Sequence, residues 1–294
     1  MTTSVYPLRF TVANRTLCSV NLRVAHINGF GKATTDNFGS LLPDQCPTDL
    51  DGYLLHSVQV ASELPVLQRS EPTIQYVLAR YTHYRTDLTG SFEDFLKTKA
   101  SKTRSTLRRK VRKFAEAGKD GELDWREYHG PKDLETFFKL ALPLAQTTYQ
   151  ARLFEGALPD TPEFREESRQ LASSGQLRCY LLFLNGAPVA YLYSPIENRT
   201  AIYAYLGYDE SVSVLSPGTV LQYLVHERLF SDPDVDWFDF TEGDGAHKAL
   251  FANDLSPSIN LLCLRDTLRN RALTQLHSHW GRSLERVKRF LEKQ

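Results

Sequence analysis

Short strand-like runs dominate the first third of the chain, and a long run with helical spacing follows them. Apolar residues alternate or cluster over four segments, so strands are predicted at residues 8–13, 17–27, 53–58 and 74–84. Ser91 is expected to cap a short helix at residues 92–97. A second helix is predicted at residues 101–117, with an apolar stripe formed by Leu107, Val111 and Phe114. The first 118 residues are therefore expected to place strands before a helical segment.

The remaining residues mix helices and strands in a less regular order. Asn185-Gly186 between two apolar runs is a strong signal for a two-residue hairpin. Helices are expected from residue 131, from Thr161-Pro162, at 217–230, at 246–252 and at 273–291, and strands at 122–128, 176–184, 187–193, 200–207, 235–240 and 259–264. Along the strand at 200–207, Tyr203 and Tyr205 are expected on one face, since successive side chains alternate. The order predicts a mixed α/β protein, neither a regular βα alternation nor separate layers of strands and helices.

Composition excludes several classes of protein. Hydrophobic residues make up 41% of the 294 residues, which is enough for a substantial core. Lys plus Arg and Asp plus Glu are balanced at 35 each, so no overall charge indicates nucleic acid or membrane binding. The four cysteines are scattered and no metal-ligand spacing is found, which predicts reduced thiols, no metal and a cytoplasmic protein. Neither a signal peptide nor a membrane span is recognisable.

A polar loop directly after the apolar run at 235–240 carries the main candidate chemistry. Glu242, Asp244, His247 and Lys248 lie within seven positions of one another, with Gly243 and Gly245 between them. Ligands collect at the carboxyl ends of strands in open sheets that contain parallel pairs, so these groups can handle protons and bind an anion there. A solvated turn with a glycine bend is the alternative. Asp239, which alternates with apolar neighbours, is expected to be structural.

Ser216, Pro217, Gly218 and Thr219 open the helix predicted at 217–230. A helix N-terminus presents unpaired backbone N–H groups and a partial positive charge to an anion such as a pyrophosphate. Gly218 permits close approach, and the hydroxyls of Ser216 and Thr219 can add donors. An ordinary Ser N-cap followed by Pro is the alternative.

The order of elements from residue 122 to 264 resembles the Gcn5-related N-acetyltransferase (GNAT) fold. Ser216-Pro217-Gly218, Asp239-Phe240, Gly243-Asp244 and His247-Lys248 resemble the CelD-like and FemAB-like branch of that superfamily. The resemblance implies a GNAT-like mixed sheet flanked by helices, in two tandem halves. The first half, residues 1–118, would be a degenerate copy that includes the basic helix. The second, residues 119–294, would be the acyltransferase domain with the C-terminal amphipathic helix.

The same resemblance implies an N-acyltransferase that moves an acyl group from acyl-CoA, acetyl-CoA or longer, directly to an amine. The acceptor would be a small molecule or a carrier-bound amine, and no metal would take part. Glu242 is the preferred base, His247 acts directly or through water, and Lys248 binds a phosphate or stabilises the oxyanion. Ser216, Gly218 and Thr219 would bind the cofactor.

Two other functions stay open. The superfamily's usual Gln/Arg-x-x-Gly-x-Gly/Ala loop is absent from residues 209–215, and FemAB-like relatives can take the donor from aminoacyl-tRNA. Residues 99–113 contain eight basic and no acidic residues, so Arg104 and Arg108 are candidates for phosphate or RNA contacts, with a solvated helix face as the alternative. A non-catalytic GNAT-like module that binds RNA or an anionic partner is the third candidate.

The acceptor is expected at the end of the helix that starts near residue 131. Thr147, Tyr149 and Gln150 follow its apolar part, and Tyr205 is the candidate contributed by the sheet. The basic C-terminal helix either packs within the chain or joins two copies as a homodimer; the sequence does not distinguish these arrangements.

Overall fold

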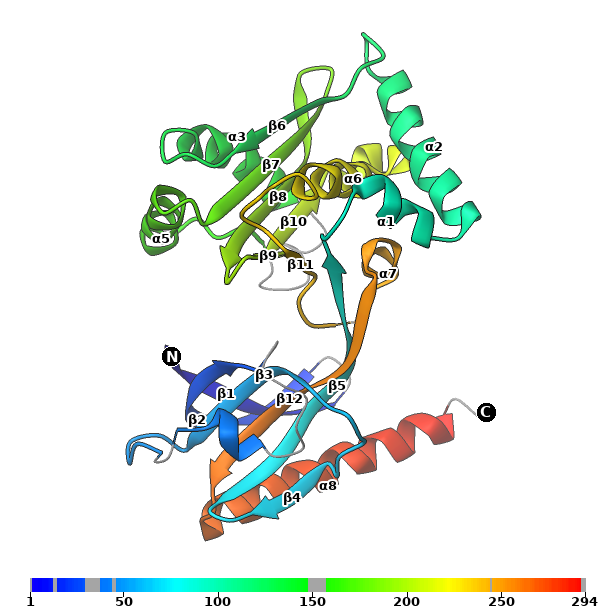
Figure 1. Cartoon of the computed structure of the whole chain (residues 1–294). Coiled ribbons are helices and arrows are strands. Elements are labelled where there is room, and N and C mark those ends of the chain that lie inside the picture. The colour runs from blue at the N-terminus through cyan, green and yellow to red at the C-terminus, as the bar shows by residue number, and fades with distance from the viewer. Residues whose placement is uncertain are drawn as a thin grey trace. The chain divides into compact units, whose positions relative to one another are not determined.

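The strands and helices of the chain group into two compact units (Figure 1). The computed structural model describes residues 2–12, 15–29, 38–43, 46–147, 157–243 and 245–291. Unit 1 consists of Met1–His83 and Ser256–Gln294, and unit 2 of Tyr84–Leu255. Unit 2 is therefore inserted, in chain order, into unit 1.

Unit 1 contains a mixed sheet. Its strands are β1 (Thr2–Val12), β2 (Arg15–Asn28), β3 (Gly52–Gln59), β4 (Leu67–Ser70), β5 (Thr73–Asp87) and β12 (Asp254–Arg265). They are ordered β1-β2-β3-β12-β5, with β4 paired to β5. Only β2 and β3 run parallel among the strand pairs whose register is described in this unit. A Cβ at Gly52 would lie 2.1 Å from the carbonyl oxygen of Cys263, so glycine allows β3 and β12 to pair there.

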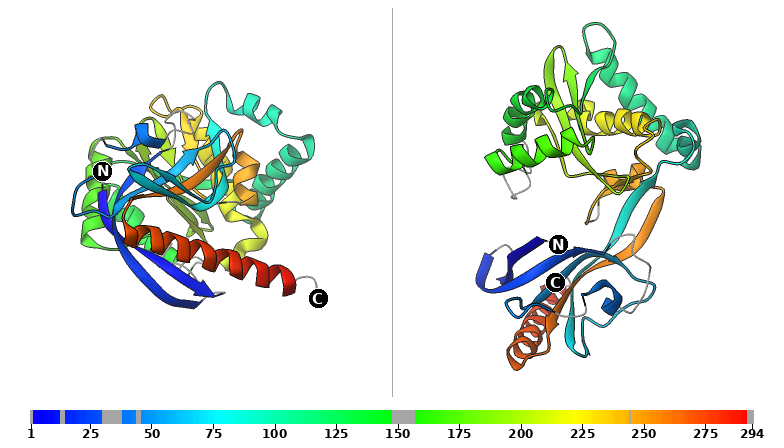
Figure 2. Two further views of the ribbon diagram at one scale, coloured as in Figure 1. Left: turned by 90° about the horizontal axis from the view of Figure 1, so that it is seen from below. Right: turned by 60° about the vertical axis from the view of Figure 1, so that its left-hand side comes forward.

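Helix α8 (Leu268–Leu291) lies along one face of this sheet (Figures 1 and 2). The indole Nε1 of Trp280 donates to the carbonyl of Thr11 at 3.0 Å, and the hydroxyl of Tyr76 lies 2.6 Å from Nδ1 of His277. The opposite face buries Phe38 of η1 (Phe38–Leu41) with Leu55 and Ile259. The predicted amphipathic C-terminal helix thus packs against its own sheet.

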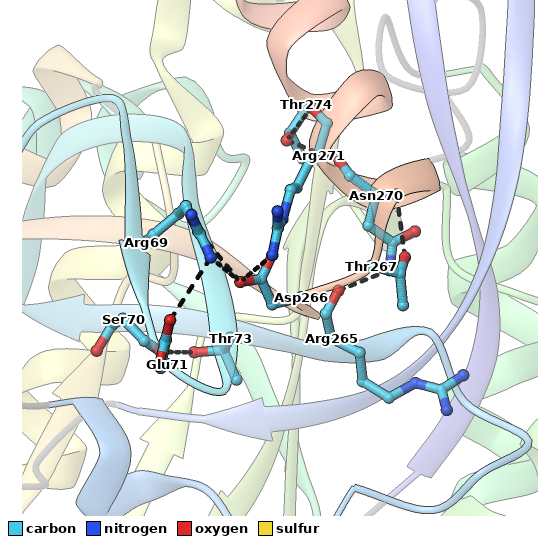
Figure 3. Close-up of polar contacts among 10 residues, drawn as sticks. All are labelled: Arg69, Ser70, Glu71, Thr73, Arg265, Asp266, Thr267, Asn270, Arg271 and Thr274. Carbon is cyan, nitrogen blue, oxygen red and sulfur yellow. Dashed lines mark hydrogen bonds and ion pairs between the residues drawn. The ribbon is translucent and has the colours of Figure 1, made fainter.

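Ion pairs join β4 to the start of α8 (Figure 3). Nη2 of Arg69 lies 2.7 Å from Oδ2 of Asp266, and Nη2 of Arg271 donates to the same oxygen at 3.0 Å. The hydrogen bonds from Arg271 and Arg69 lower the pKa of Asp266. This cluster fixes the chain where it leaves β12 and enters the last helix.

The sheet of unit 2 is ordered β11-β9-β8-β7-β6, with β10 paired to β8 and the end of β5 paired to β11. Its strands are β6 (Asp124–Tyr128), β7 (Leu177–Leu184), β8 (Ala187–Glu197), β9 (Thr200–Ile202), β10 (Tyr205–Tyr208) and β11 (Trp237–Asp239). Its helices are α1 (Phe92–Thr98), α2 (Ser101–Ala117), α3 (Leu134–Thr147), α5 (Pro162–Ser173), α6 (Pro217–Leu229) and α7 (Ala246–Phe251), with the 3₁₀ segment η2 (Glu210–Leu215).

Helices cover both faces of this sheet (Figure 1). On one face α1, α2, α6 and α7 pack with Tyr180 and Leu182, and on the other α3 and α5 pack with Cys179 and Leu181. Neighbouring residues of β7 thus enter different cores, as the pleat of a strand requires. The predicted mixed α/β architecture is what the structure shows.

The limits of the two compact units differ from the boundary expected between residues 118 and 119. They lie between His83 and Tyr84 and between Leu255 and Ser256. Helix α2 belongs to unit 2 because Leu107 and Phe114 are buried in the same core as Tyr180. The last strand and helix belong to unit 1, where β12 pairs with β3. Contacts between residues far apart in the chain, which local patterns do not report, set these limits.

Candidate functional site

A cavity of about 340 Å³ lies in unit 2 between β10 and the N-terminal end of α6. This volume is within the range of roughly 300–1,000 Å³ that is typical of small-molecule sites. Polar and aromatic side chains predominate in its lining, which comprises Tyr203, Leu206, Gly207, Tyr208, Glu210, Ser213, Ser216, Gly218, Thr219, Gln222 and His247.

An interruption between β9 and β10 opens this cavity. Strand β9 runs parallel to β11 up to the pair Ile202 and Asp239, and the amide of Tyr203 still donates to the carbonyl of Asp239 at 2.8 Å. The amide of Ala204 then turns back to the carbonyl of Ile202 at 2.9 Å. Beyond this turn β10 pairs with β8 alone in the described part of the chain. The edge of β10 away from β8 is left for the cavity.

The interruption also corrects the expected arrangement of Tyr203 and Tyr205. The ring of Tyr203 packs at 5.8 Å from Phe240 on the face covered by α6, and it lines the cavity. The ring of Tyr205 packs at 5.8 Å from Phe164 on the opposite face, in the core with α3 and α5. A continuous strand would have kept both on one face. Tyr205 is therefore not part of the cavity lining.

The first turn of α6 forms one wall of the cavity. Ser216 adopts a left-handed backbone conformation, with φ 55° and ψ 49°, and its side chain makes no capping hydrogen bond. An added Cβ at Gly218 would lie 3.1 Å from Cδ1 of Tyr208, so the glycine allows the Tyr208 ring to lie close to the helix. Ser216, Gly218 and Thr219 all line the cavity, as a cofactor role for them would require.

Two lysines of α2 reach this end of α6. Nζ of Lys110 donates to Oγ1 of Thr219 at 3.4 Å, and Nζ of Lys113 donates to the carbonyl of Val214 at 3.1 Å. Lys110 lies about one turn from both Leu107 and Phe114, the apolar residues that anchor α2 in the core, and Lys113 directly precedes Phe114. Two cationic groups therefore lie beside the uncapped first turn of α6.

The two arginines expected to bind phosphate lie elsewhere on α2. Nη1 of Arg104 donates to the carbonyl of Lys99 at 2.7 Å, and Nη2 of Arg108 lies 2.8 Å from a carboxylate oxygen of Glu93. Arg104 and Arg108 thus join α2 to α1 and its connecting segment, and neither lines the cavity. The basic stretch is divided between these contacts and the lysines near α6.

The loop after β11 is held by its own polar groups. A carboxylate oxygen of buried Asp239 accepts from the amide of Thr241 at 2.6 Å, and Thr241 has a φ of 60°. Lys248 is 7% exposed, and its Nζ donates to the carbonyl of Glu242 at 2.8 Å and of Thr241 at 3.4 Å. Asp239 and Lys248 therefore stabilise an unusual turn. Glu242 is exposed and does not line the cavity, and Asp244 lies outside the described residues.

His247 is the member of this loop whose side chain enters the cavity lining. Its ring centroid is 6.0 Å from that of Tyr203. Loss of hydration and the neighbouring Lys248 ammonium lower the pKa of His247, so its imidazole is neutral and able to accept a proton near pH 7. Burial raises the pKa of Tyr203, which keeps its hydroxyl protonated as a hydrogen-bond donor.

The expected acceptor residues near the end of α3 are not placed. Thr147 is the last residue of that helix, but its side chain lies outside the described part of the structure, as do Tyr149 and Gln150. Among the described residues, no group of three or more His, Cys, Asp or Glu side chains is arranged to hold a metal ion. No helix of the described part is long and apolar enough to cross a membrane.

Several residues of the site were not singled out from the sequence. Gln222 interrupts an otherwise apolar stretch of α6 one turn after Gly218, and this polar exception was the signal available for it. Lys110 and Lys113 were part of the basic run, but the run alone does not tell which members turn toward α6. Tyr208 gave no local signal, since an aromatic residue near a strand end is common.

Comparison with known proteins places this geometry in a family. The model of the acetyltransferase (GNAT) domain family matches residues 101–249, about half of the chain. A search of curated protein sequences finds no match. The chain is similar to the crystal structure of FemX, with a TM-score of 0.55 and 12% identity, over 93% of this chain and 90% of that one. It is also similar to a C-terminal DUF2156 domain from Agrobacterium fabrum, with a TM-score of 0.50, 13% identity, and coverage of 77% and 72%.

These findings confirm the predicted fold class. The similarity to FemX covers most of the chain, including both units, and supports a GNAT-like mixed sheet flanked by helices in tandem. The family match runs from the start of α2 to α7 and so spans every element that lines the cavity. The chain therefore belongs to the GNAT acetyltransferase family.

Proposed function

We propose that this protein is an N-acyltransferase that transfers the acyl group of an acyl-CoA thioester to an amine. The observation that carries the proposal is the cavity at the uncapped first turn of α6, beside Lys110. Backbone N–H groups at a helix N-terminus and a nearby ammonium are the groups that bind a pyrophosphate. The same cavity contains a neutral imidazole for proton transfer.

The open edge of β10 suits the extended arm of such a donor. In the described part of the chain Leu206 and Gly207 pair with β8 on one side and face the cavity on the other. A chain that carries amide groups can add to an open strand edge by backbone hydrogen bonds. A pantetheine arm has such amides, so the donor would run from the phosphates at α6 along β10 toward His247.

His247 is the proposed general base in the transfer. The imidazole takes a proton from the attacking amine, whose nitrogen forms a bond to the thioester carbonyl carbon. The tetrahedral intermediate then collapses, the carbon–sulfur bond breaks, and the imidazolium returns the proton to the leaving thiolate. Tyr203 contributes a hydrogen bond from its protonated hydroxyl. The products are an amide and the free thiol of coenzyme A, and no other reactant is needed.

Donor binding distinguishes this proposal from transfer out of aminoacyl-tRNA. Thermal unfolding is followed with coenzyme A, with acetyl-CoA and with bulk tRNA, because a ligand that binds only the folded protein raises its melting temperature. We expect acetyl-CoA at about 100 times its Kd to stabilise the protein by about 2.7 kcal/mol. If tRNA alone stabilised the protein, the donor would be aminoacyl-tRNA and not an acyl-CoA thioester.

Release of free thiol in the presence of an amine mixture tests catalysis. His247→Ala is expected to bind acetyl-CoA but to lose roughly 10²–10⁴-fold in kcat, the usual contribution of general base catalysis. Glu242→Ala is the comparison, because its exposed side chain is outside the cavity lining. If only the Glu242 variant lost turnover, the general base would be the carboxylate of Glu242 and not His247.

A further inference from the structure

Gln222 is a buried polar residue with an unpaired side-chain donor among the described residues. The residue is 2% exposed and lines the cavity one helical turn beyond Gly218. Its side-chain Nε2 is buried and makes no hydrogen bond to any described residue. Buried polar groups in native proteins nearly always have a partner, so an orphaned donor in a cavity wall indicates a missing ligand atom.

On the side of Gln222 away from Gly218, helix α6 continues into a closed aromatic core. The main-chain carbonyl of Gln222 already accepts from Nδ1 of His226 at 2.8 Å. The His226 ring is completely buried and lies 4.7 Å from Phe238 and 4.8 Å from Phe251, centroid to centroid. This aromatic packing closes the region one turn further along α6. None of the described residues accepts a hydrogen bond from the side-chain Nε2 of Gln222.

The side-chain amide of Gln222 is uncharged, which indicates the kind of ligand atom that it binds. The first turn of α6 and the neighbouring Lys110 are the groups suited to the anionic parts of a donor. Gln222 lies one turn further along α6 and offers a neutral N–H, which matches the neutral oxygen of a carbonyl better than a phosphate. Acyl-CoA compounds carry such carbonyls beyond their phosphates, in the pantetheine amides and in the thioester.

We propose that Gln222 is a specificity residue that donates a hydrogen bond from Nε2 to a carbonyl oxygen of the bound acyl donor. The proposal rests on the acyl-CoA function given above and names a recognition element within that site. Donors that lack an oxygen at this position would leave the amide unpaired, and the site would select against them.

Gln222→Met tests the proposal, because methionine keeps the length of the side chain and removes the N–H donor. Two changes in opposite directions are expected. The Kd for acetyl-CoA should rise about tenfold, as for the loss of one hydrogen bond. The melting temperature of the ligand-free protein should stay the same or rise by about 2–4 °C, because an unpaired buried donor has been removed.

Gln75→Met is the matched control. Gln75 is 5% exposed, and its side-chain oxygen accepts from Nε2 of Gln68 at 2.6 Å. Removing a satisfied buried amide should lower the melting temperature and leave the Kd for acetyl-CoA unchanged. The two glutamine variants therefore separate loss of a ligand contact from loss of packing.

Comparison of acetyl-CoA with free coenzyme A identifies the oxygen. If Gln222→Met weakens both ligands equally, the partner is a pantetheine carbonyl; if it weakens acetyl-CoA alone, the partner is the thioester oxygen. Unchanged affinity for both overturns the inference, and so does a fall in melting temperature that accompanies the weaker binding. Failure of the wild-type protein to bind any coenzyme A compound would instead overturn the proposed function.

Discussion

His247 and His226 show how two histidines of the same unit can have different tasks. Both have a lowered pKa, chiefly through loss of hydration, although His247 is exposed at the surface. His226 is completely buried, its pKa falls to about 3, and its Nδ1 is bound to the main chain of Gln222. His247 lines the cavity, where a substrate can reach it. Access therefore favours His247 as the proposed proton acceptor, while His226 fills the core.

The pH dependence of turnover follows from His247. The general base must be neutral, and its pKa is lowered below the ordinary value of about 6.5, so kcat/KM should stay level down to about pH 6.5. Below its pKa, kcat/KM should fall tenfold per pH unit. Thiol release measured from pH 4.5 to 8 tests this, with circular dichroism to confirm folding. An acidic limb centred above pH 7 would contradict His247 as the base.

At the scale of elements, the packing of α2 on α6 brings positive charge to the cavity. The apolar residues Leu107 and Phe114 fix the rotation of α2, and Lys110 and Lys113 then face η2 and the first turn of α6. Helix α2 thus adds positive charge to the proposed anion site at the start of α6. Its arginines at 104 and 108 are used to hold α1 in place.

Lys110→Ala should weaken binding of acetyl-CoA about tenfold at low salt, because it removes a charge from the proposed phosphate site. The difference should shrink as salt is added, since exposed charges are screened. Lys102→Ala removes the same charge from an exposed position in the first turn of α2 and should leave the Kd nearly unchanged. Equal losses in the two lysine variants, measured by calorimetry, would show a diffuse charge effect and no defined site.

Elements with strong local signals were predicted well from the sequence. Ser91 and Thr161 cap α1 and α5 with their side chains, and Asn185 has the positive φ that its hairpin requires. The break after Ile202 could not be predicted, because it depends on where β9 leaves β11. The role of Lys248 was also hidden, since its partners are carbonyl groups of a turn that only the fold defines.

At the scale of the molecule, membership of the two units does not follow the halves expected from the sequence. Core residues of unit 2 come from segments before residue 119, including Phe92, Phe95 and Leu107. Strand β12 and helix α8 complete unit 1, although they follow unit 2 in the chain. Sequence patterns specify elements, whereas closure of a core depends on long-range pairing. The expected division at residue 118 therefore rests on the resemblance to tandem GNAT-like halves. It does not coincide with the limits of the two compact units.

Fragments of the chain test this division. Residues 84–255 contain all of unit 2 and should unfold in one cooperative transition that acetyl-CoA shifts upward. Residues 119–294 lack α1 and α2 and should show no cooperative transition, because buried residues such as Leu107 and Phe114 are missing from the core. Thermal unfolding of both fragments is the measurement. Cooperative unfolding of 119–294 with acetyl-CoA binding would favour the division at residue 118.

The insertion of unit 2 between the two segments of unit 1 has a consequence for synthesis of the protein. Strand β12 lies between β3 and β5 in the sheet order, yet its residues from Ser256 onward are made after all of unit 2. On the ribosome, residues 84–255 can complete their own core while β3 and β5 still lack the strand that separates them. Unpaired strand edges are prone to wrong pairing. The nascent chain thus passes through a stage in which unit 2 is complete and unit 1 still lacks residues 256–265.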